Sequence, residues 1–252
     1  AMTRLQRQRR RRRANGSTKN RVLLGLAVLG SAVLVGMLAL VGYVVSIAAS
    51  APDISSLKPI DQGGSSAIFA SDGQRLGFIQ ADQLRTPLPA AKIPQVLKQA
   101  TVAIEDQRFY KHKGVDYEGI IRAAIKNLRS GKNLQGGSTI TMQLVRNLYI
   151  ENPKRNFSRK IREAKLAEEL ENQHTKQWIL DKYLNSVSYG TFGGQTAVGI
   201  QAAARTIFDK SVSRLTLEEA ALLAGLPHAP SEYNPFHKPH RALVRRNDVL
   251  RK

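Results

Sequence analysis

The chain has 252 residues, enough for one domain of ordinary size and an additional segment. Hydrophobic residues make up 42% of the sequence, so most of it can bury a core. Because there is no cysteine, disulfides, thiolate metal sites and a cysteine nucleophile are excluded. The formal net charge of +20 indicates a polyanionic partner such as anionic lipid, phosphate or nucleic acid.

Much of the charge lies at the N-terminus, beside a long apolar segment. Residues 1–21 contain nine basic residues and no acidic one, and residues 22–51 contain no charged residue. An apolar helix of this length, at about 1.5 Å per residue, crosses a hydrocarbon core of ~30 Å. The basic residues before it predict a cytoplasmic N-terminus. We therefore expect a disordered basic cytoplasmic tail over 1–21, a transmembrane helix over 22–51 and membrane lipid, not nucleic acid, as the partner of the tail.

The next segment, residues 52–92, is rich in Pro, Gly and Ser. Short apolar runs on both sides of Asp72-Gly73 predict a β-hairpin around that turn. We expect a stalk that carries a short hairpin.

From residue 93 to residue 252 the apolar period becomes helical, which predicts a mainly α-helical domain. An apolar stripe over 117–128 indicates core packing, and the alternative is a basic helix on the bilayer surface. Three further helices are expected: one capped by Ser158 that runs to about Glu171, one over 175–184, and one over 220–224 preceded by a capping box, Thr216 to Glu219.

Three clusters carry candidate chemistry. Glu105 and Asp106 end an apolar helical run, where partial burial suits a general base; the alternative is an exposed helix-end acid paired with Arg108 or Lys111. A glycine turn, Gly136-Gly137, precedes a helix start at Ser138-Thr139, which suits phosphate binding but is equally typical of an ordinary helix cap.

The third cluster, residues 154–163, contains five basic residues before Glu163. Such a run suits phosphate binding, although a solvated charged face is the common alternative. Together the clusters supply a base, a second acid, a flexible turn and phosphate-binding cations next to a membrane. This combination fits transfer of a sugar from a lipid pyrophosphate.

The segment from Ala103 to about Pro235 resembles the peptidoglycan glycosyltransferases, glycosyltransferase family 51. The resemblance lies in five ordered blocks: Glu105-Asp106 with Phe109, His112 and Gly114; residues 136–144; Arg159-Lys160 with Glu163; Ile179-Leu180 with residues 183–185; and residues 219–235. Departures from the family pattern occur at Met142, Arg146 and Ile207, where many members have Gln, Lys and Tyr.

The resemblance implies a lysozyme-like α fold that polymerises lipid II into β-1,4 glycan with inversion and release of undecaprenyl pyrophosphate. Glu105 corresponds to the general base and Glu163 to the second acid, a candidate ligand for a divalent cation such as Mg²⁺; no tightly bound cofactor is implied. The implied substrate-binding residues are Asp106, Phe109, His112, Gly137, Ser138, Thr139, Gln143, Arg146, Arg155, Arg159, Lys160 and Asn185.

The implied partners are lipid II, the growing glycan chain on undecaprenyl pyrophosphate, other cell-wall synthesis proteins and the inhibitor moenomycin. The implied location is the bacterial cytoplasmic membrane, crossed once, with the catalytic domain outside the cytoplasm. No Ser-x-x-Lys followed by Ser-x-Asn and Lys-Thr-Gly occurs, so we expect no transpeptidase site here. The N-terminal part of a class A penicillin-binding protein is expected, with a monofunctional enzyme as the alternative.

Two other classes of function remain open. A lysozyme-like glycan hydrolase or lytic transglycosylase needs an acid that protonates a sugar leaving group, and it has no use for the basic run over 154–162. A non-catalytic membrane-anchored scaffold for wall assembly would be favoured by loss of either acid, but both are present.

Overall fold

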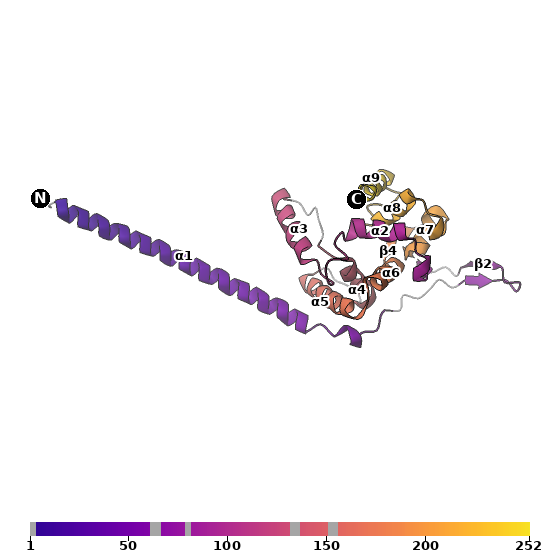
Figure 1. The fold of residues 1–252 in the computed structure, drawn as a ribbon, viewed down its shortest axis with the longest axis horizontal. Helices are drawn as coiled ribbons and strands as arrows, with labels where there is room; N and C mark the ends of the chain where they lie inside the picture. Colours follow the sequence, from indigo (N-terminus) through magenta and orange to yellow (C-terminus); the bar gives the residue numbers. More distant parts are fainter. Residues whose placement is uncertain (1–3, 61–66, 79–81, 132–136, 151–155) are drawn as a thin grey trace. The chain divides into compact units, whose positions relative to one another are not determined.

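The structure is a computed structural model that describes residues 4–60, 67–78, 82–131, 137–150 and 156–252. The chain divides into two compact units, residues 1–50 and residues 51–252. Figure 1 shows the order of their helices and strands along the chain.

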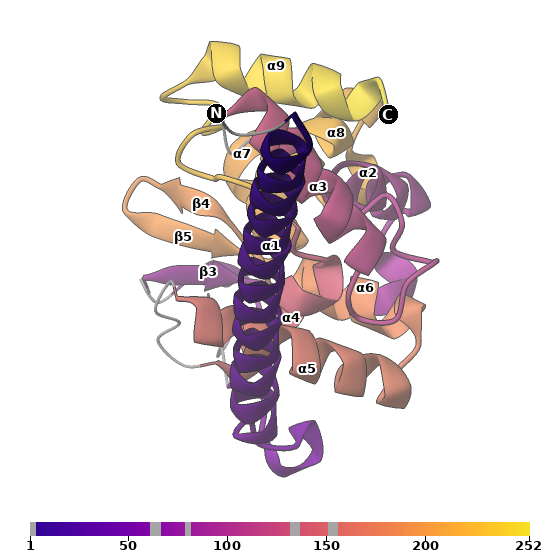
Figure 2. The ribbon, with the colours of Figure 1, turned by 90° about the vertical axis from the view of Figure 1, so that its left-hand side faces the viewer.

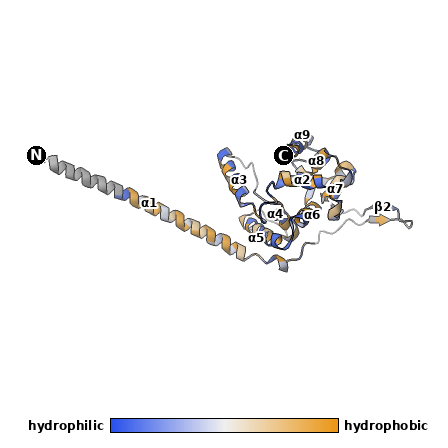
Figure 3. Cartoon of the chain, in the orientation of Figure 1, coloured by the Kyte–Doolittle hydropathy of each residue, from blue (hydrophilic) through white to orange (hydrophobic). Residues whose placement is uncertain are grey.

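The first unit is one long helix, α1 (Arg4–Ala49). It includes most of the basic tail, so the expectation of a disordered tail is wrong. Arg, Gln and Ala are strong helix formers, and a helix already formed over the apolar segment extends without a new nucleation step. Among the described residues, one candidate membrane span is found, Asn20–Ser56, with a mean hydropathy of 2.5. Figure 3 shows the hydrophobic residues along this part of α1.

The predicted hairpin lies near the start of the second unit. Strands β1 (Ala67–Phe69) and β2 (Arg75–Phe78) pair antiparallel, with Ala67 opposite Phe78. The turn lies at the predicted Asp72-Gly73, where Gly73 adopts φ +82° and the Asp72 carboxylate accepts a hydrogen bond from the backbone of Gln74. The hairpin is therefore confirmed.

The rest of the second unit is mainly helical. In chain order its elements are η1 (Ile54–Ser56), β3 (Gln83–Arg85), η2 (Ala90–Lys92), α2 (Gln95–Glu105), α3 (Tyr117–Ser130), α4 (Ile140–Tyr149), α5 (Phe157–Gln173), α6 (Lys176–Ser186), β4 (Ser188–Phe192), β5 (Gln195–Val198), α7 (Ile200–Phe208), η3 (Val212–Arg214), α8 (Leu217–Gly225) and α9 (Pro239–Leu250). The expectation of a mainly α-helical chain is confirmed.

A small sheet that the helical period did not predict lies among these helices. Its order is β3-β5-β4, with β3 parallel and β4 antiparallel to β5 (Figure 2). Strand β3 and the buried Ile54 belong to the segment expected to be a stalk. Residues of that segment therefore also build the sheet and core of the second unit.

Two groups of helices position the candidate site. Helix α4 packs on α5 and α6, and α8 packs on α2 and α9. The main core contains fully buried side chains from the first group, such as Leu144, Leu170 and Leu184. Ile104, at the end of α2, packs in a second apolar cluster with Ala221, Ala224 and Val249 of α8 and α9. Burial of each such Leu or Ile side chain stabilises the folded state by roughly 1.5–3 kcal/mol.

The helix starts are set by side-chain caps. Thr139 caps α4 and Thr216 forms the predicted capping box with Glu219. Helix α5 is capped by Asn156, not by Ser158 as expected, because the Asn156 side chain accepts a hydrogen bond from the backbone of Arg159 at 2.8 Å. An amide cap of this kind satisfies one of the unpaired donors of the first turn.

The apolar stripe of α3 does not pack in the core. Its members Tyr117, Ile120, Ile121, Ile125 and Leu128 are exposed, and Leu128 is 86% exposed. Of the helix residues, Ala123, which is not in the stripe, is buried. The core-packing interpretation is therefore wrong, and the alternative of a helix facing the bilayer surface stays a prediction.

Candidate active site

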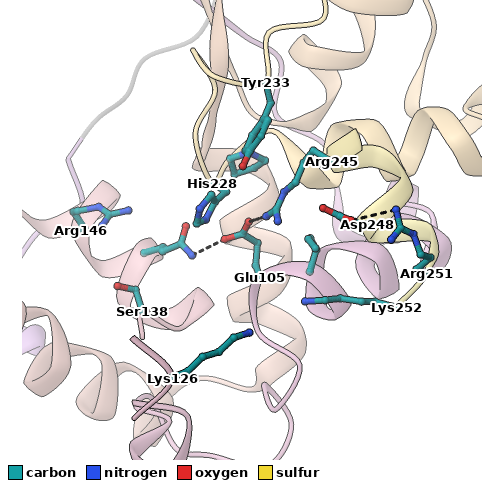
Figure 4. Close-up of a pocket in the computed structure, with 13 residues that line it drawn as sticks. Glu105, Lys126, Ser138, Arg146, His228, Tyr233, Arg245, Asp248, Arg251 and Lys252 are labelled. Carbon is teal, nitrogen blue, oxygen red and sulfur yellow. Dashed lines mark hydrogen bonds and ion pairs between the residues drawn. The ribbon is translucent and has the colours of Figure 1, made fainter. Parts of the chain in front are cut away.

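Glu105 is the last residue of α2, and its side chain is 4% exposed. Each of its carboxylate oxygens faces one donor. Gln143 of α4 donates from Nε2 to Oε2 at 3.0 Å, and Arg245 of α9 approaches Oε1 with Nη2 at 3.4 Å. Three helices distant in sequence therefore hold one carboxylate, as the dashed lines of Figure 4 show.

The Gln143 amide is itself oriented by a buried tyrosine. The Tyr183 hydroxyl donates to Gln143 Oε1 at 3.1 Å, which leaves the amide nitrogen to face Glu105. Burial, followed by the negative charge of Glu105, raises the pKa of Tyr183 and of Tyr189. Both phenols therefore stay protonated, and Tyr183 stays a donor in this chain of hydrogen bonds.

Asp106 turns away from Glu105 and supports the turn after α2. Its carboxylate contacts His112 Nε2 at 3.0 Å and accepts a hydrogen bond from the backbone of Ile140 at 3.0 Å. It thereby provides the anion at the start of α4, where backbone N–H groups favour negative charge. The first turn of α4 is thus an ordinary capped helix start, and the phosphate interpretation of this turn is not needed to explain it.

Glu163 lies on α5 and its side chain is 0% exposed. Arg159 and Lys160 each place a nitrogen 3.2 Å from its carboxylate, and Arg146 of α4 lies at 3.9 Å. Three cations thus surround one carboxylate, and this excess of positive charge suits a diphosphate. Lys160 also donates to the Ser138 hydroxyl, which ties the glycine turn to the cluster.

A cavity of about 690 Å³ lies beside Glu105, and Glu163 is not among the residues that line it. Glu105, Ser138, Gln143 and Arg146 line it, and two of these, Ser138 and Arg146, also contact the cluster around Glu163. Figure 4 shows that further cationic and aromatic side chains surround Glu105: Lys126, His228, Tyr233, Arg245, Arg251 and Lys252. Burial, followed by the positive charge of Arg245, lowers the pKa of Lys252.

The cavity does not include every residue that the family resemblance implied. Phe109 is fully buried, and Asp106, His112 and Thr139 are buried and contact the protein. Asp106 and Thr139 line a second, smaller cavity beside Glu105 and Ser138. A substrate-binding role for these four residues stays a prediction.

Three other implied residues have different outcomes. Asn185 bonds to the backbone of Leu88 and lines a separate cavity, and its role in substrate binding stays a prediction. Gly137 lies where a Cβ would come within 2.9 Å of Ile120, so it allows the glycine turn to approach α3. Arg155 lies outside the described residues.

Arg245 is a site residue that the sequence analysis did not single out. It lies three residues after Ala242 and four before Val249, the two buried residues of α9. That spacing places it on the inner face of the helix. A cation on a buried helix face is the signal that could have identified it.

The residues around Glu163 do not fit a protein-held metal ion. Among the residues that the structure describes, no group of three or more His, Asp or Glu side chains is arranged to hold one. The neighbours of Glu163 are cations, whereas Mg²⁺ requires oxygen ligands. The arrangement instead supplies a carboxylate at a cavity wall and a cationic cluster for an anionic leaving group.

Comparison with known proteins agrees with this chemistry. A sequence model of the family described as "Transglycosylase" matches residues 72–252. The chain belongs to this family, the peptidoglycan glycosyltransferases, and its helical second unit is the lysozyme-like domain of that class. The chain corresponds to the N-terminal glycosyltransferase part of a class A penicillin-binding protein.

Two curated relatives illustrate the similarity. Penicillin-binding protein 1A of Aquifex aeolicus is 40% identical over 232 residues, which cover 92% of this chain and 31% of that protein. Penicillin-binding protein 1A of Escherichia coli is 43% identical over 199 residues, which cover 79% of this chain and 23% of that protein. The chain thus spans less than a third of these relatives.

A solved structure is also similar. The crystal structure of penicillin-binding protein 1A from Haemophilus influenzae is 27% identical, with coverage of 77% of this chain and 18% of that chain and a TM-score of 0.40.

Proposed function

We propose that this chain polymerises lipid II into β-1,4-linked glycan, with inversion at the anomeric carbon and release of undecaprenyl pyrophosphate. One observation carries the proposal: a carboxylate held at a cavity wall is connected, through Ser138 and Arg146, to a second carboxylate surrounded by cations. The first group suits proton transfer and the second suits a diphosphate leaving group.

In the proposed reaction Glu105 accepts the proton of the acceptor 4-hydroxyl. The acceptor oxygen then bonds to the anomeric carbon of the donor chain, and the bond from that carbon to the diphosphate oxygen breaks. The electron pair leaves with the diphosphate, whose charge Arg146, Arg159 and Lys160 stabilise. Pre-positioned cations of this kind replace protonation of the leaving group. Inversion follows because the base and the leaving group act on opposite faces of the sugar.

The proposed substrates carry lipid chains, so the reaction takes place at a membrane. The apolar segment of α1 and the exposed stripe of α3 support this location. The basic residues before the apolar segment support a cytoplasmic N-terminus, which places the catalytic unit outside the cytoplasmic membrane.

The test is product formation from purified lipid II in detergent. We expect long polymer from the wild-type chain and at least about 100-fold less from Glu105→Gln, since general-base catalysis contributes typically 10²–10⁴-fold. Glu163→Gln should also lose polymer. The matched control is Glu218→Gln, which removes an exposed carboxylate outside the cavity and should polymerise like the wild type.

Two outcomes would contradict the proposal. Cleavage of preformed glycan without polymerisation would identify a hydrolase or lytic transglycosylase. Inertness of the wild-type chain in both assays would favour the scaffold. Moenomycin supplies a separate check, because we expect it to bind at the donor diphosphate site and to bind less tightly to Arg159→Gln.

A further inference from the structure

We propose that Arg245 is a positioning residue for the base: its guanidinium fixes the orientation of the Glu105 carboxylate at the cavity wall. The inference rests on the proposed role of Glu105. The two residues are 140 positions apart in the chain, and their side chains are 15% and 4% exposed. A contact between a guanidinium and a carboxylate that are both poorly solvated restricts where each side chain can lie.

The contact between Arg245 and Glu105 is longer than that of a strong structural salt bridge, which suits the role of Glu105 as a base. The Nη2–Oε1 distance is 3.4 Å, whereas a strong charge-assisted hydrogen bond is about 2.7–2.9 Å long. The contact is thus a longer ion pair than the 3.0 Å bond from Gln143 to the other oxygen. Oε1 therefore keeps the capacity to accept a hydrogen bond from a substrate hydroxyl.

Arg245 is itself held in place by the surrounding helices. Its Nε donates to the backbone oxygen of Gly225 at 3.3 Å, and its guanidinium carbon lies 5.4 Å from the centre of the Tyr233 ring. A Cβ on Gly225 would come within 2.8 Å of Arg245 Cγ. The absence of a side chain at Gly225 therefore lets α9 lie close enough to α8 for Arg245 to reach the base.

The same helix also packs against the residue before the base. Val249 of α9 shares an apolar cluster with Ile104, so that α9 fixes the end of α2 by packing and the carboxylate by charge. Only the second effect depends on the charge of Arg245, and this separates the proposal from a structural role.

Other groups around Glu105 do not change in the test. The polar and charged residues that face it or line its cavity are Gln143 and Arg146 of α4, Tyr183 of α6, Tyr189 of β4, Lys126 of α3, His228 and Tyr233 after α8, and Asp248, Arg251 and Lys252 at the end of α9. Arg245 is the cation in direct contact with the carboxylate among the described residues.

The test is the kcat and KM of lipid II polymerisation by the full chain and by Arg245→Met, which keeps an apolar stem over Tyr233 but removes the charge. Arg245→Met should lower kcat by about 100-fold and leave KM within about threefold of the wild type, because misplacement of a reacting group by about 1 Å costs this much in the chemical step. Arg245→Lys, which keeps a charge, should regain at least about tenfold of the lost kcat.

The matched control is Arg246→Gln. Arg246 is the next residue on α9, and its guanidinium contacts Asn247 instead of the cavity. Its kcat and KM should match those of the wild type. An unchanged kcat in Arg245→Met, or no recovery of kcat in Arg245→Lys, would overturn the inference. If Arg245→Met does not fold, Arg245→Gln is measured in its place with the same two outcomes.

The two proposals fail separately. An active Glu105→Gln variant would overturn the proposed function itself. An inactive Glu105→Gln variant together with an unchanged kcat in Arg245→Met would overturn the further inference alone.

Discussion

Gly114 shows how a single residue without a side chain supports the site. It adopts φ +80°, and a Cβ at this position would lie 2.6 Å from the backbone of Ala167 in α5. Its carbonyl oxygen accepts a hydrogen bond from the Thr139 hydroxyl at 2.6 Å. The turn after the base is thereby joined to both α4 and α5, the two helices that carry the cationic cluster.

Gly114→Ala should lower the free energy of unfolding by roughly 3 kcal/mol, because it adds left-handed backbone strain of about 1–2 kcal/mol and steric overlap of about 1–3 kcal/mol. The matched control is Gly193→Ala. Gly193 also has a positive φ, +56°, but has open space around its Cβ, so its cost should be about 1–2 kcal/mol. Denaturant unfolding of both variants in detergent measures the difference. Equal losses would show that the approach of α5 does not limit this position.

At the scale of an element, α3 is a helix of the second unit whose surface does not match a soluble environment. It exposes an apolar stripe, and basic residues such as Arg122, Lys126 and Arg129 lie off that stripe. Contiguous apolar surface of this kind marks an interaction site. A basic amphipathic helix is typical of a bilayer surface.

The prediction for α3 is that its stripe contacts acyl chains. Because the chain contains no cysteine, single nitroxide labels can be placed at Leu128→Cys and, as the matched control on the adjacent exposed position, Arg129→Cys. In proteoliposomes with anionic lipid, the label at 128 should collide more often with oxygen, which concentrates in the bilayer, and less often with a water-soluble nickel chelate. The label at 129 should show the reverse. Equal access of the chelate to both positions would contradict a membrane contact.

At the scale of the whole molecule, the uneven distribution of charge predicts topology. Nine of the basic residues precede the apolar segment, and short basic flanks stay on the cytoplasmic side. The catalytic unit that follows residue 50 is then expected on the other side of the membrane, where its lipid-linked substrates would be polymerised.

Single cysteines also test this topology. In right-side-out membrane preparations, a membrane-impermeant maleimide should label Ser71→Cys, at the exposed turn of the β1-β2 hairpin. It should label Ala14→Cys, in the basic tail, only after the membrane is permeabilised. Labelling of Ala14→Cys in sealed preparations, with protection of Ser71→Cys, would reverse the orientation.

The sequence by itself determined the features that depend on local patterns. The apolar segment, the hairpin at Asp72-Gly73, the capping box at Thr216 and the two acids are all readable from composition, period or motif order. These are set by neighbours along the chain, since turn, cap and helix preferences act over a few residues. Family resemblance then assigned Glu105 and Glu163 to one chemistry, although their proximity to one cavity came from the structure.

Only the tertiary structure decided which side chains meet and which faces stay open. The period of α3 was correctly helical, but a stripe looks the same whether core or lipid covers it. Asp106 and Phe109 share the motif of Glu105, yet only the structure shows that both side chains are buried. Arg245 reaches Glu105 only because Gly225 lets α9 pack closely on α8. Contacts between helices distant in sequence depend on how the whole core packs, and local preference does not encode them.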